Sequence, residues 1–387
     1  MGWTNLLWLV WIPSMPWMLV FFARFLKNRS VFINKESAPL PHSPFIIFQI
    51  TTKSCPPVVE RVVQELRATC SSTGYSNYRI DVVGDECGNV SVPKEYLTPN
   101  HTRFKARALH CAVEWRRRRG ENTDKVWIFH LDEESFVTQQ CLASILRYLD
   151  KPDPKPVAEG PIFYPNLIET AGISRFADAM RPYICYNCVS ELRNGLPAYI
   201  HGSNLLVRAD IEDAVGWDFG KYSAGEDGFF ATEIWRRFGK VFDWHGGVIE
   251  EQPPLTVKDW VRQHRRWFIG SMQNMRFLPR GKKVEVLSQL VGWAWSLPAL
   301  IVDVLALFFV QSIPLVVTIF LWSMTLIWLQ SFQNGMRFNT RKLGLAKRLL
   351  IHLELLVAIP LINVVEATAA ASAFLHRRDF QWIPTTK

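Results

Sequence analysis

The stretch that decides the fold is Lys125–Glu134, which reads KVWIFHLDEE. The run Val126–Phe129 is entirely apolar, and three acidic residues, Asp132–Glu134, follow closely after it. A short apolar run bounded by polar residues predicts a buried strand, here Lys125–Leu131. The acids stand where that strand is expected to end, so this end is the first place to look for chemistry.

Outward from this strand, the N-terminal side alternates between strand-like and helix-like patterns. Strands are predicted at Phe45–Ile50 and Tyr78–Val83, and helices at Val58–Ala68 and His101–Arg119. Strands that alternate with helices predict an α/β fold in which helices cover both faces of a mostly parallel sheet. Ligands of such sheets bind at the carboxyl ends of the strands.

Long apolar runs lie on either side of this region. Hydrophobic residues make up 49% of the 387 residues and charged residues 20%, which excludes a disordered protein. The first 23 residues carry no charged side chain, and Asp303 is the only charge between Val286 and Met336. Runs of this length predict membrane segments, which we expect over residues 3–25, 286–309, 313–330 and 349–375.

The layout predicts three regions, namely a transmembrane anchor at residues 1–29, a cytosolic catalytic domain at 40–283, and membrane segments with a short tail at 284–387. Basic residues flank the apolar runs and account for much of the net charge of +9. Such charges orient a chain in a membrane, so no nucleic-acid partner is indicated. The last segment carries Glu354, Pro360 and Glu366, and it is expected either to cross the membrane or to be partly interfacial.

The seven cysteines all fall in the central region, at spacings that do not suggest a disulfide framework. Packed thiols in a reducing, cytosolic compartment are therefore predicted. Cys185 and Cys188 form a C-x-x-C pair, which lacks the further ligands that a zinc site needs.

Three acidic motifs are candidates for chemistry. The cluster Asp132–Glu134 is interpreted either as a site for Mg²⁺ or Mn²⁺ or as a solvated acidic turn. Asp85, at the end of the second strand, either reaches a nucleotide or lies in an ordinary turn. The segment Gly225–Gly228 reads GEDG and also has two interpretations. Either one of its acids acts as a general base, or Asp227 caps the N-terminus of a helix.

A fourth motif is basic and aromatic. Gln263–Trp267 reads QHRRW and lies on a helix predicted from about Val257. One interpretation is a basic helix at a membrane interface. The other turns Arg266 toward a phosphate, which its guanidinium binds bidentately, and stacks Trp267 under a sugar.

In this order the four motifs resemble the membrane-embedded family 2 glycosyltransferases, such as cellulose, chitin and hyaluronan synthases. That resemblance implies a GT-A-like, Rossmann-type catalytic domain inserted between transmembrane helices. Three further stretches are most similar to the egghead-type β-1,4-mannosyltransferases. They are Tyr164–Leu167 (YPNL), His201–Asn204 (HGSN) and Glu250–Thr256 (EEQPPLT).

The resemblance implies a role for each matching residue. Asp227, with Glu226, is catalytic and deprotonates the acceptor hydroxyl, and Asp132 and Glu134 hold a metal ion, Mn²⁺ or Mg²⁺. The donor contacts Thr51, Asp85, Asp132 and Arg266, and the acceptor contacts His201, Gly202, Ser203, Gln263 and Trp267. Three motifs depart from the family pattern: the metal cluster reads Asp-Glu-Glu, the first motif reads Gly-Asp-Glu around Asp85, and Gly225 precedes the Glu-Asp pair.

The function implied is an inverting glycosyltransferase that moves mannose from GDP-mannose to a lipid-linked or glycan acceptor. There are two alternatives. One is a processive polysaccharide synthase that uses a UDP-sugar, and the other is a non-catalytic membrane scaffold.

The protein is expected to be a multi-pass membrane protein in contact with membrane lipids, with its catalytic domain facing the cytosol. The sequons at Asn28, Asn89 and Asn100 then stay unglycosylated. Asp303, Glu354 and Glu366 are expected either to contact a lipid head group or to pair between helices.

Overall fold

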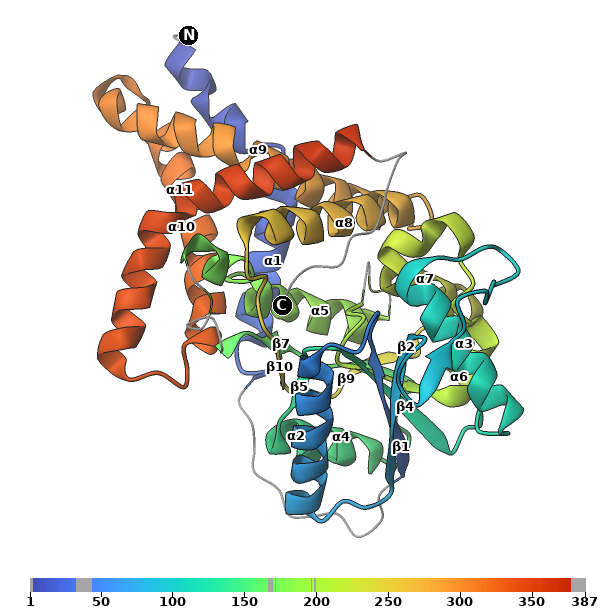
Figure 1. Ribbon diagram of the computed structural model, residues 1–387. Coiled ribbons are helices and arrows are strands. Elements are labelled where there is room, and N and C mark those ends of the chain that lie inside the picture. The colour runs from blue at the N-terminus through green and yellow to red at the C-terminus, as the bar shows by residue number, and fades with distance from the viewer. Residues whose placement is uncertain are drawn as a thin grey trace. The chain divides into compact units, whose positions relative to one another are not determined.

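The computed structural model describes residues 3–32, 44–165, 170, 172–195, 197 and 200–376. The chain forms two compact units, which we describe separately (Figure 1). The sheet unit comprises Arg29–Phe163 and Cys188–Gln252, and the helical unit comprises Met1–Asn28, Tyr164–Asn187 and Pro253–Lys387. The predicted domain boundaries stay predictions.

The sheet unit is built on a seven-stranded sheet in the order β3-β2-β1-β4-β8-β6-β9. Its neighbours pair in parallel except at β4–β8 and β8–β6, so the mostly parallel α/β fold is confirmed. All three predicted strands are present. The strands are β1 (Phe45–Thr51), β2 (Tyr78–Asp85), β3 (Val90–Val92), β4 (Val126–Asp132), β6 (Val157–Glu159), β8 (Leu205–Arg208) and β9 (Phe242–Trp244).

Helices cover both faces of this sheet. Figure 1 shows α2 (Pro57–Thr73) and α4 (Gln139–Leu149) on one face, with α3 (Phe104–Arg118) and α6 (Ala209–Val215) on the other. The central strands are consequently apolar on both sides, as in Phe48 of β1, which is fully buried. The unit also contains η4 (Gly220–Gly225), α7 (Glu226–Phe238) and part of α5 (Arg181–Asn194).

The parallel register aligns the carboxyl ends of the central strands. Thr51 at the end of β1 lies opposite Val83 of β2 and Asp132 of β4. The sheet unit also contains a small second sheet. In it, β10 (Ile249–Glu250) pairs with β5 (Phe136–Val137) and β7 (Ile162–Phe163). It brings the loop after β4 close to the chain around Glu251.

Three helices in the described part of the helical unit are long and apolar enough to cross a membrane. They are α9 (Arg280–Phe308), α10 (Leu315–Asn339) and α11 (Leu345–Leu375), and each overlaps one of the last three predicted membrane segments. The other elements of the unit are η1 (Trp3–Trp11), α1 (Met15–Asn28), η3 (Gly172–Phe176), part of α5, α8 (Val257–Met275) and η5 (Val310–Ser312).

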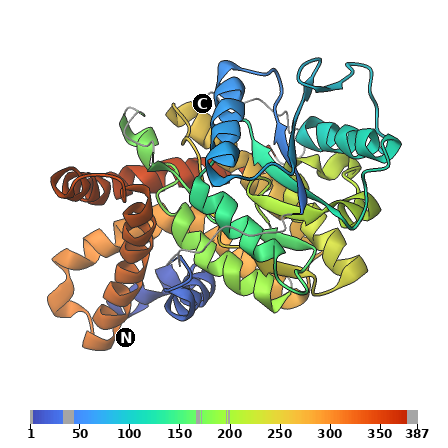
Figure 2. The same cartoon turned by 90° about the horizontal axis from the view of Figure 1, so that it is seen from below.

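The N-terminal segment is two helices, not one. The helix η1 ends at Trp11 and α1 begins at Met15, because Pro13 lies between them and lacks a backbone N–H donor. Both pieces pack beside α9 and α10 (Figure 2), where the ring of Trp17 stacks on Trp293 at 6.2 Å. A transmembrane anchor at residues 1–29 stays a prediction.

The helix α11 bends partway along its length, and its second half runs beside α8 (Figure 1). Pro360 lies inside this helix and removes one of its backbone hydrogen bonds. A partly interfacial last segment stays a prediction, and α11 is also long and apolar enough to cross a membrane.

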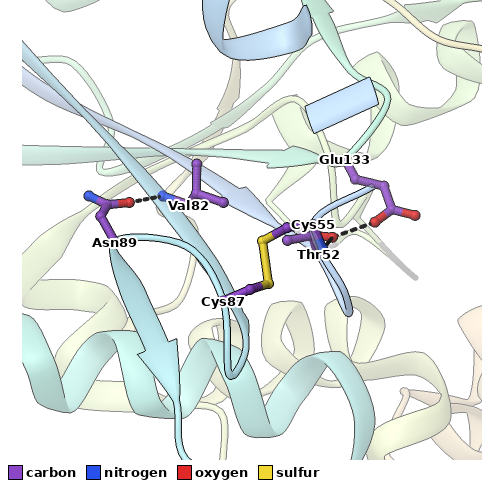
Figure 3. The surroundings of a disulfide bond; sticks show 6 residues. All are labelled: Thr52, Cys55, Val82, Cys87, Asn89 and Glu133. Atoms are coloured by element: carbon purple, nitrogen blue, oxygen red, sulfur yellow. Dashed lines mark hydrogen bonds between the residues drawn. A yellow bond between two sulfur atoms is a disulfide. The ribbon is translucent and has the colours of Figure 1, made fainter. Parts of the chain in front are cut away.

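The cysteines depart from the prediction at one pair. Cys55 and Cys87 form a disulfide that joins the loop after β1 to the loop after β2 (Figure 3). The expectation of packed thiols throughout is therefore wrong for this pair, since residues 32 positions apart in sequence meet only when β1 and β2 pair. The other five cysteines are free and buried, as expected.

Candidate functional site

Two basic side chains from the first turn of α3 reach the carboxyl edge of the sheet. Arg107 Nη2 donates to Asp85 Oδ1 at 2.5 Å, and Lys105 Nζ forms an ion pair with Asp132. One helix thus holds the carboxylates at the ends of β2 and β4, the two strands that flank β1. Asp85 and Asp132 were predicted from the sequence as site residues, whereas Lys105 and Arg107 were not.

Lys105 is the centre of this cluster. Its Nζ also donates to the carbonyl oxygen of Gly202 at 2.9 Å. A Cβ at Gly202 would lie 3.1 Å from Lys105 Nζ and 3.4 Å from Asp227 Oδ2, so Asp132 and Asp227 both face this amine. Burial opposes the charge of Lys105, but the negative charges of Asp132, Glu226 and Asp227 outweigh it and raise the pKa. The amine is therefore a fixed positive charge among the predicted catalytic acids.

Glu226 and Asp227 occupy the first turn of α7. The helix is capped by Gly225, so the interpretation of Asp227 as the capping residue is wrong. Asp227 Oδ1 accepts a hydrogen bond from the backbone N–H of Gly228 at 2.8 Å. The N-terminal end of a helix attracts negative charge, so it is a favourable place for this acidic pair.

The predicted metal ligands follow the end of β4. Asp132 is half-buried, whereas Glu134 is buried with 4% of its surface exposed. Carboxylate oxygens fit Mg²⁺ or Mn²⁺, so the donor set is suitable for either ion. A bound ion and the amine of Lys105 would then both contact the carboxylate of Asp132. The metal-ligand role of Asp132 and Glu134 stays a prediction.

The end of β1 supplies two hydroxyl groups to the same edge. The buried Thr51 Oγ1 has no hydrogen-bond partner among the described residues. Thr52 Oγ1 donates to Glu133 Oε2 at 2.6 Å, as Figure 3 shows. Thr51 therefore keeps a hydroxyl available for the donor contact that the resemblance implies.

His201 lies inside the sheet unit, with 2% of its surface exposed. Its Nδ1 lies 2.6 Å from Glu159 Oε1, and its Nε2 lies 3.6 Å from Cys188 Sγ. These three residues are close enough to be a metal-binding group. The histidine faces these two neighbours with opposite ring nitrogens, Nδ1 toward Glu159 and Nε2 toward Cys188. Acceptor binding by His201 stays a prediction.

Ser203 is a junction between three loops. Its Oγ lies 2.8 Å from Ser135 Oγ and donates to Glu251 Oε1 at 2.8 Å. Ser135 Oγ also donates to Glu251 at 2.7 Å. All three side chains are buried. The network fixes the HGSN segment against the loop that carries Glu133 and Glu134. Acceptor binding by Gly202 and Ser203 stays a prediction.

A buried ionic network lies beside the last part of β4. Arg116 of α3 pairs with Glu212 of α6 at 2.5 Å, and His130 Nε2 lies 3.2 Å from the same carboxylate. Burial would raise the pKa of Glu212, but the charges of Arg116 and His130 outweigh burial and lower it to about 2. The network ties α3 and α6 to the strand that ends in Asp132.

In the helical unit, the motif Gln263–Trp267 lies on α8 as predicted. Gln263, Arg266 and Trp267 are spaced three and four residues apart, so they share one face of the helix. Arg266 is half-buried and forms no hydrogen bond or ion pair with any other residue that the structure describes. Its guanidinium is therefore available to an anion, while the diphosphate contact itself stays a prediction.

Lys105 and Arg107 could have been found from the sequence. In a strand–helix unit the helix begins near the carboxyl edge that the preceding strand has just reached. The helix predicted at His101–Arg119 follows the strand that carries Asp85 at its end. Lys105 and Arg107 lie near the start of this helix, so they can be expected to face the acids. The contacts of Glu212 with Arg116 and of Ser203 with Glu251 could not be predicted in this way, because each contact joins residues that are far apart in sequence.

Comparisons with known proteins show which proteins this chain resembles. The chain is 28% identical over 282 residues to the β-1,4-mannosyltransferase bre-3 of Caenorhabditis briggsae, which covers 68% of this chain and 60% of the relative. It is 30% identical over 250 residues to the β-1,4-mannosyltransferase egh of Drosophila melanogaster, covering 59% of this chain and 52% of that protein. The matches thus span about half to three fifths of the curated relatives.

Among solved structures, the mannosyltransferase PcManGT from Pyrobaculum calidifontis, in complex with GDP-Man and Mn²⁺, aligns with a TM-score of 0.48 and 12% identity. The alignment covers 94% of this chain and 99% of that one. The sequence model for glycosyl transferase family group 2 matches residues 127–332, which is more than half of the chain and contains Asp132, Asp227 and the QHRRW motif. The chain belongs to this glycosyltransferase family.

Proposed function

We propose that this protein is an inverting, metal-assisted mannosyltransferase that moves mannose from GDP-mannose to a lipid-linked acceptor and forms a β-glycosidic bond. The observation that carries the proposal is the convergence of Asp132, Asp227 and the Gly202 carbonyl around Lys105, in a chain of this glycosyltransferase family. The transferred sugar is inferred from the relatives, which are β-1,4-mannosyltransferases, and GDP-mannose as its donor follows from the resemblance to the egghead-type enzymes.

In the proposed reaction Asp227 accepts the proton of the acceptor hydroxyl. The oxygen attacks the anomeric carbon as the bond from that carbon to the diphosphate breaks, and the electron pair leaves with the diphosphate. Attack from the face opposite the leaving group inverts the anomeric centre. A divalent ion held by Asp132 and Glu134 would supply positive charge for the leaving diphosphate.

The other residues of the chain orient the two substrates. Lys105 keeps Asp132 and Asp227 in place despite their mutual repulsion. Thr51 and Asp85 would contact the nucleotide at the carboxyl edge of the sheet. Arg266 would bind the diphosphate, because its planar guanidinium donates two parallel hydrogen bonds.

A lipid-linked acceptor is inferred from the membrane helices. The described residues include three candidate spans, and such a small number favours a single addition over a processive synthase with a translocation channel. The acceptor would then meet the enzyme at the membrane surface, near the amphipathic helix α8.

We further propose that the sheet unit faces the cytosol, where nucleotide sugars are made. In support, the side-chain amides of all three sequon asparagines already donate hydrogen bonds inside the protein. Asn28 Nδ2 donates to Tyr186 O at 3.1 Å, Asn89 Nδ2 to Ile80 O at 3.1 Å, and Asn100 Nδ2 to Asp218 Oδ2 at 3.0 Å.

The test is product formation by the purified protein in detergent with Mn²⁺ or Mg²⁺. GDP-mannose and the common UDP-sugars are each supplied with and without glucosylceramide. A single-sugar lipid product from GDP-mannose is expected, and Asp227→Asn should abolish it. The matched control is Asp153→Asn, which changes an exposed aspartate and should keep wild-type activity. A polymer ladder, or an active Asp227→Asn variant, would contradict the proposal.

A further inference from the structure

The second half of α11 carries a buried carboxylate in an otherwise uncharged stretch. Glu366 has 2% of its surface exposed. Its Oε1 accepts a hydrogen bond from Trp260 Nε1 at 2.9 Å, and its Oε2 lies 2.9 Å from His264 Nδ1. Both partners belong to α8 and lie one turn apart. A buried carboxylate is strongly unfavourable without partners, so these two contacts explain why the helix tolerates Glu366.

The contact continues from His264 to the tryptophan of the QHRRW motif. The rings of His264 and Trp267 stack with their centroids 4.5 Å apart and their planes at 29°. The guanidinium of Arg181 lies 5.1 Å from the centroid of the Trp267 ring. The orientation of Trp267 is thus fixed by its neighbours, and His264 is itself anchored to a second helix through Glu366.

We propose that Glu366 is a positioning residue for the acceptor. It fixes the ring of His264, and His264 fixes the ring of Trp267, against which the resemblance places the acceptor sugar. This inference rests on the proposed function. An aromatic platform that is already held in its binding orientation loses less conformational freedom when a sugar binds to it. Glu366 therefore acts on acceptor binding through two other side chains, without touching the substrate.

Two other acidic residues in the three apolar helices, Asp303 and Glu354, serve different contacts. Asp303 accepts hydrogen bonds from Trp11 Nε1 at 3.2 Å and from Thr325 Oγ1 at 2.7 Å, between η1, α9 and α10. Glu354, in the first half of α11, forms an ion pair with Arg175 at 3.1 Å. Glu354 is consequently a matched control for Glu366, because the same substitution can be made in the same helix.

The experiment compares steady-state kinetics of Glu366→Gln, His264→Asn, the double variant and Glu354→Gln, with GDP-mannose and glucosylceramide as substrates. Glu366→Gln is expected to raise the acceptor KM about tenfold. The donor KM, and the rate of donor hydrolysis without acceptor, should not change. Because Glu366 acts through His264, the double variant should match His264→Asn alone, and Glu354→Gln should behave as wild type.

An unchanged acceptor KM in Glu366→Gln, or effects of the two substitutions that add in the double variant, would overturn the proposal. A second readout does not depend on sugar transfer: hydrogen exchange of residues 260–270 should accelerate in Glu366→Gln and not in Glu354→Gln. Unaltered exchange there would also overturn the inference. A wild-type protein that transfers no sugar would instead count against the proposed function. If Glu366→Gln fails to fold, His264→Asn alone must still raise the acceptor KM selectively.

Discussion

At the scale of single residues, Lys105 shows how the protein tolerates several acids at one site. Asp132, Glu226 and Asp227 all act on its amine, which also donates to the Gly202 carbonyl. Like charges this close repel one another, and a cation between them removes much of the repulsion. Lys105 provides this cation from within the chain, so the acids stay close together before any ion or substrate binds.

We expect Lys105→Met to lower kcat of sugar transfer about 100-fold, because the substitution keeps the length of the side chain and removes its charge. Steady-state kinetics measure the effect. The matched control is Lys94→Met at an exposed lysine, which should retain the wild-type rate. A Lys105→Met variant with normal kcat would show that the amine has no part in holding the acids.

At the scale of elements, the helices α3 and α6 are tied to β4 by buried charges. Arg116 is 1% exposed and Glu212 is fully buried, and Trp217 Nε1 donates to the same carboxylate at 2.7 Å. Removing one partner from a buried ion pair leaves a charge without compensation, which destabilises more than replacing the whole pair. The site thus depends on a network that itself makes no contact with the predicted catalytic acids.

Arg116→Met is expected to lower the free energy of unfolding by about 3–5 kcal/mol at neutral pH. The neighbouring Arg117→Met should cost less than about 1 kcal/mol, because Arg117 forms an exposed ion pair with Asp213. Chemical or thermal denaturation of the purified protein measures both. Equal losses in the two variants would contradict a special role for the buried pair.

The same pair predicts how stability depends on pH. The pKa of Glu212 falls from an ordinary 4.5 to about 2 on folding, so its contribution is complete above pH 4.5. That contribution is lost as the pH falls from 4.5 toward 2, because protonation then removes the charge that Arg116 stabilises. The difference between wild type and Arg116→Met should therefore shrink in acid.

At the scale of the whole molecule, two observations bear on the compartment. The sheet unit carries a disulfide between Cys55 and Cys87, a bond that is uncommon in the cytosol. The sequons, however, have their amides in internal hydrogen bonds, and Asn28 is 7% exposed. A cytosolic sheet unit stays our proposal, because nucleotide sugars are made in the cytosol.

We therefore predict that Asn89 and Asn100 carry no glycan when the full chain is expressed in eukaryotic cells. Mass spectrometry of the corresponding peptides, with and without an N-glycosidase, measures occupancy. As a positive control, a sequon placed in an exposed loop on the opposite side of a membrane helix should be modified. Glycan on Asn89 or Asn100 would invert the proposed orientation.

The sequence by itself determined the local pattern of this protein. Short, mostly apolar runs specify β1 and β4, because strands covered on both faces have few polar positions, whereas β2 combines apolar residues with Arg79 and Asp81. The acids Asp85 and Asp132 could be selected because they follow such runs directly. Long charge-free stretches specify the apolar helices for a similar reason, since their length and composition are properties of one continuous segment.

Only the tertiary structure decided which distant residues meet. The contact of Lys105 with Asp132, the bond between Cys55 and Cys87, and the contact of Glu366 with His264 each join segments that are separated in sequence. Periodicity and composition describe one segment at a time, so they carry no information about such pairs. The pairs form because strand register and helix packing bring the segments together, and they determine what the selected residues can do.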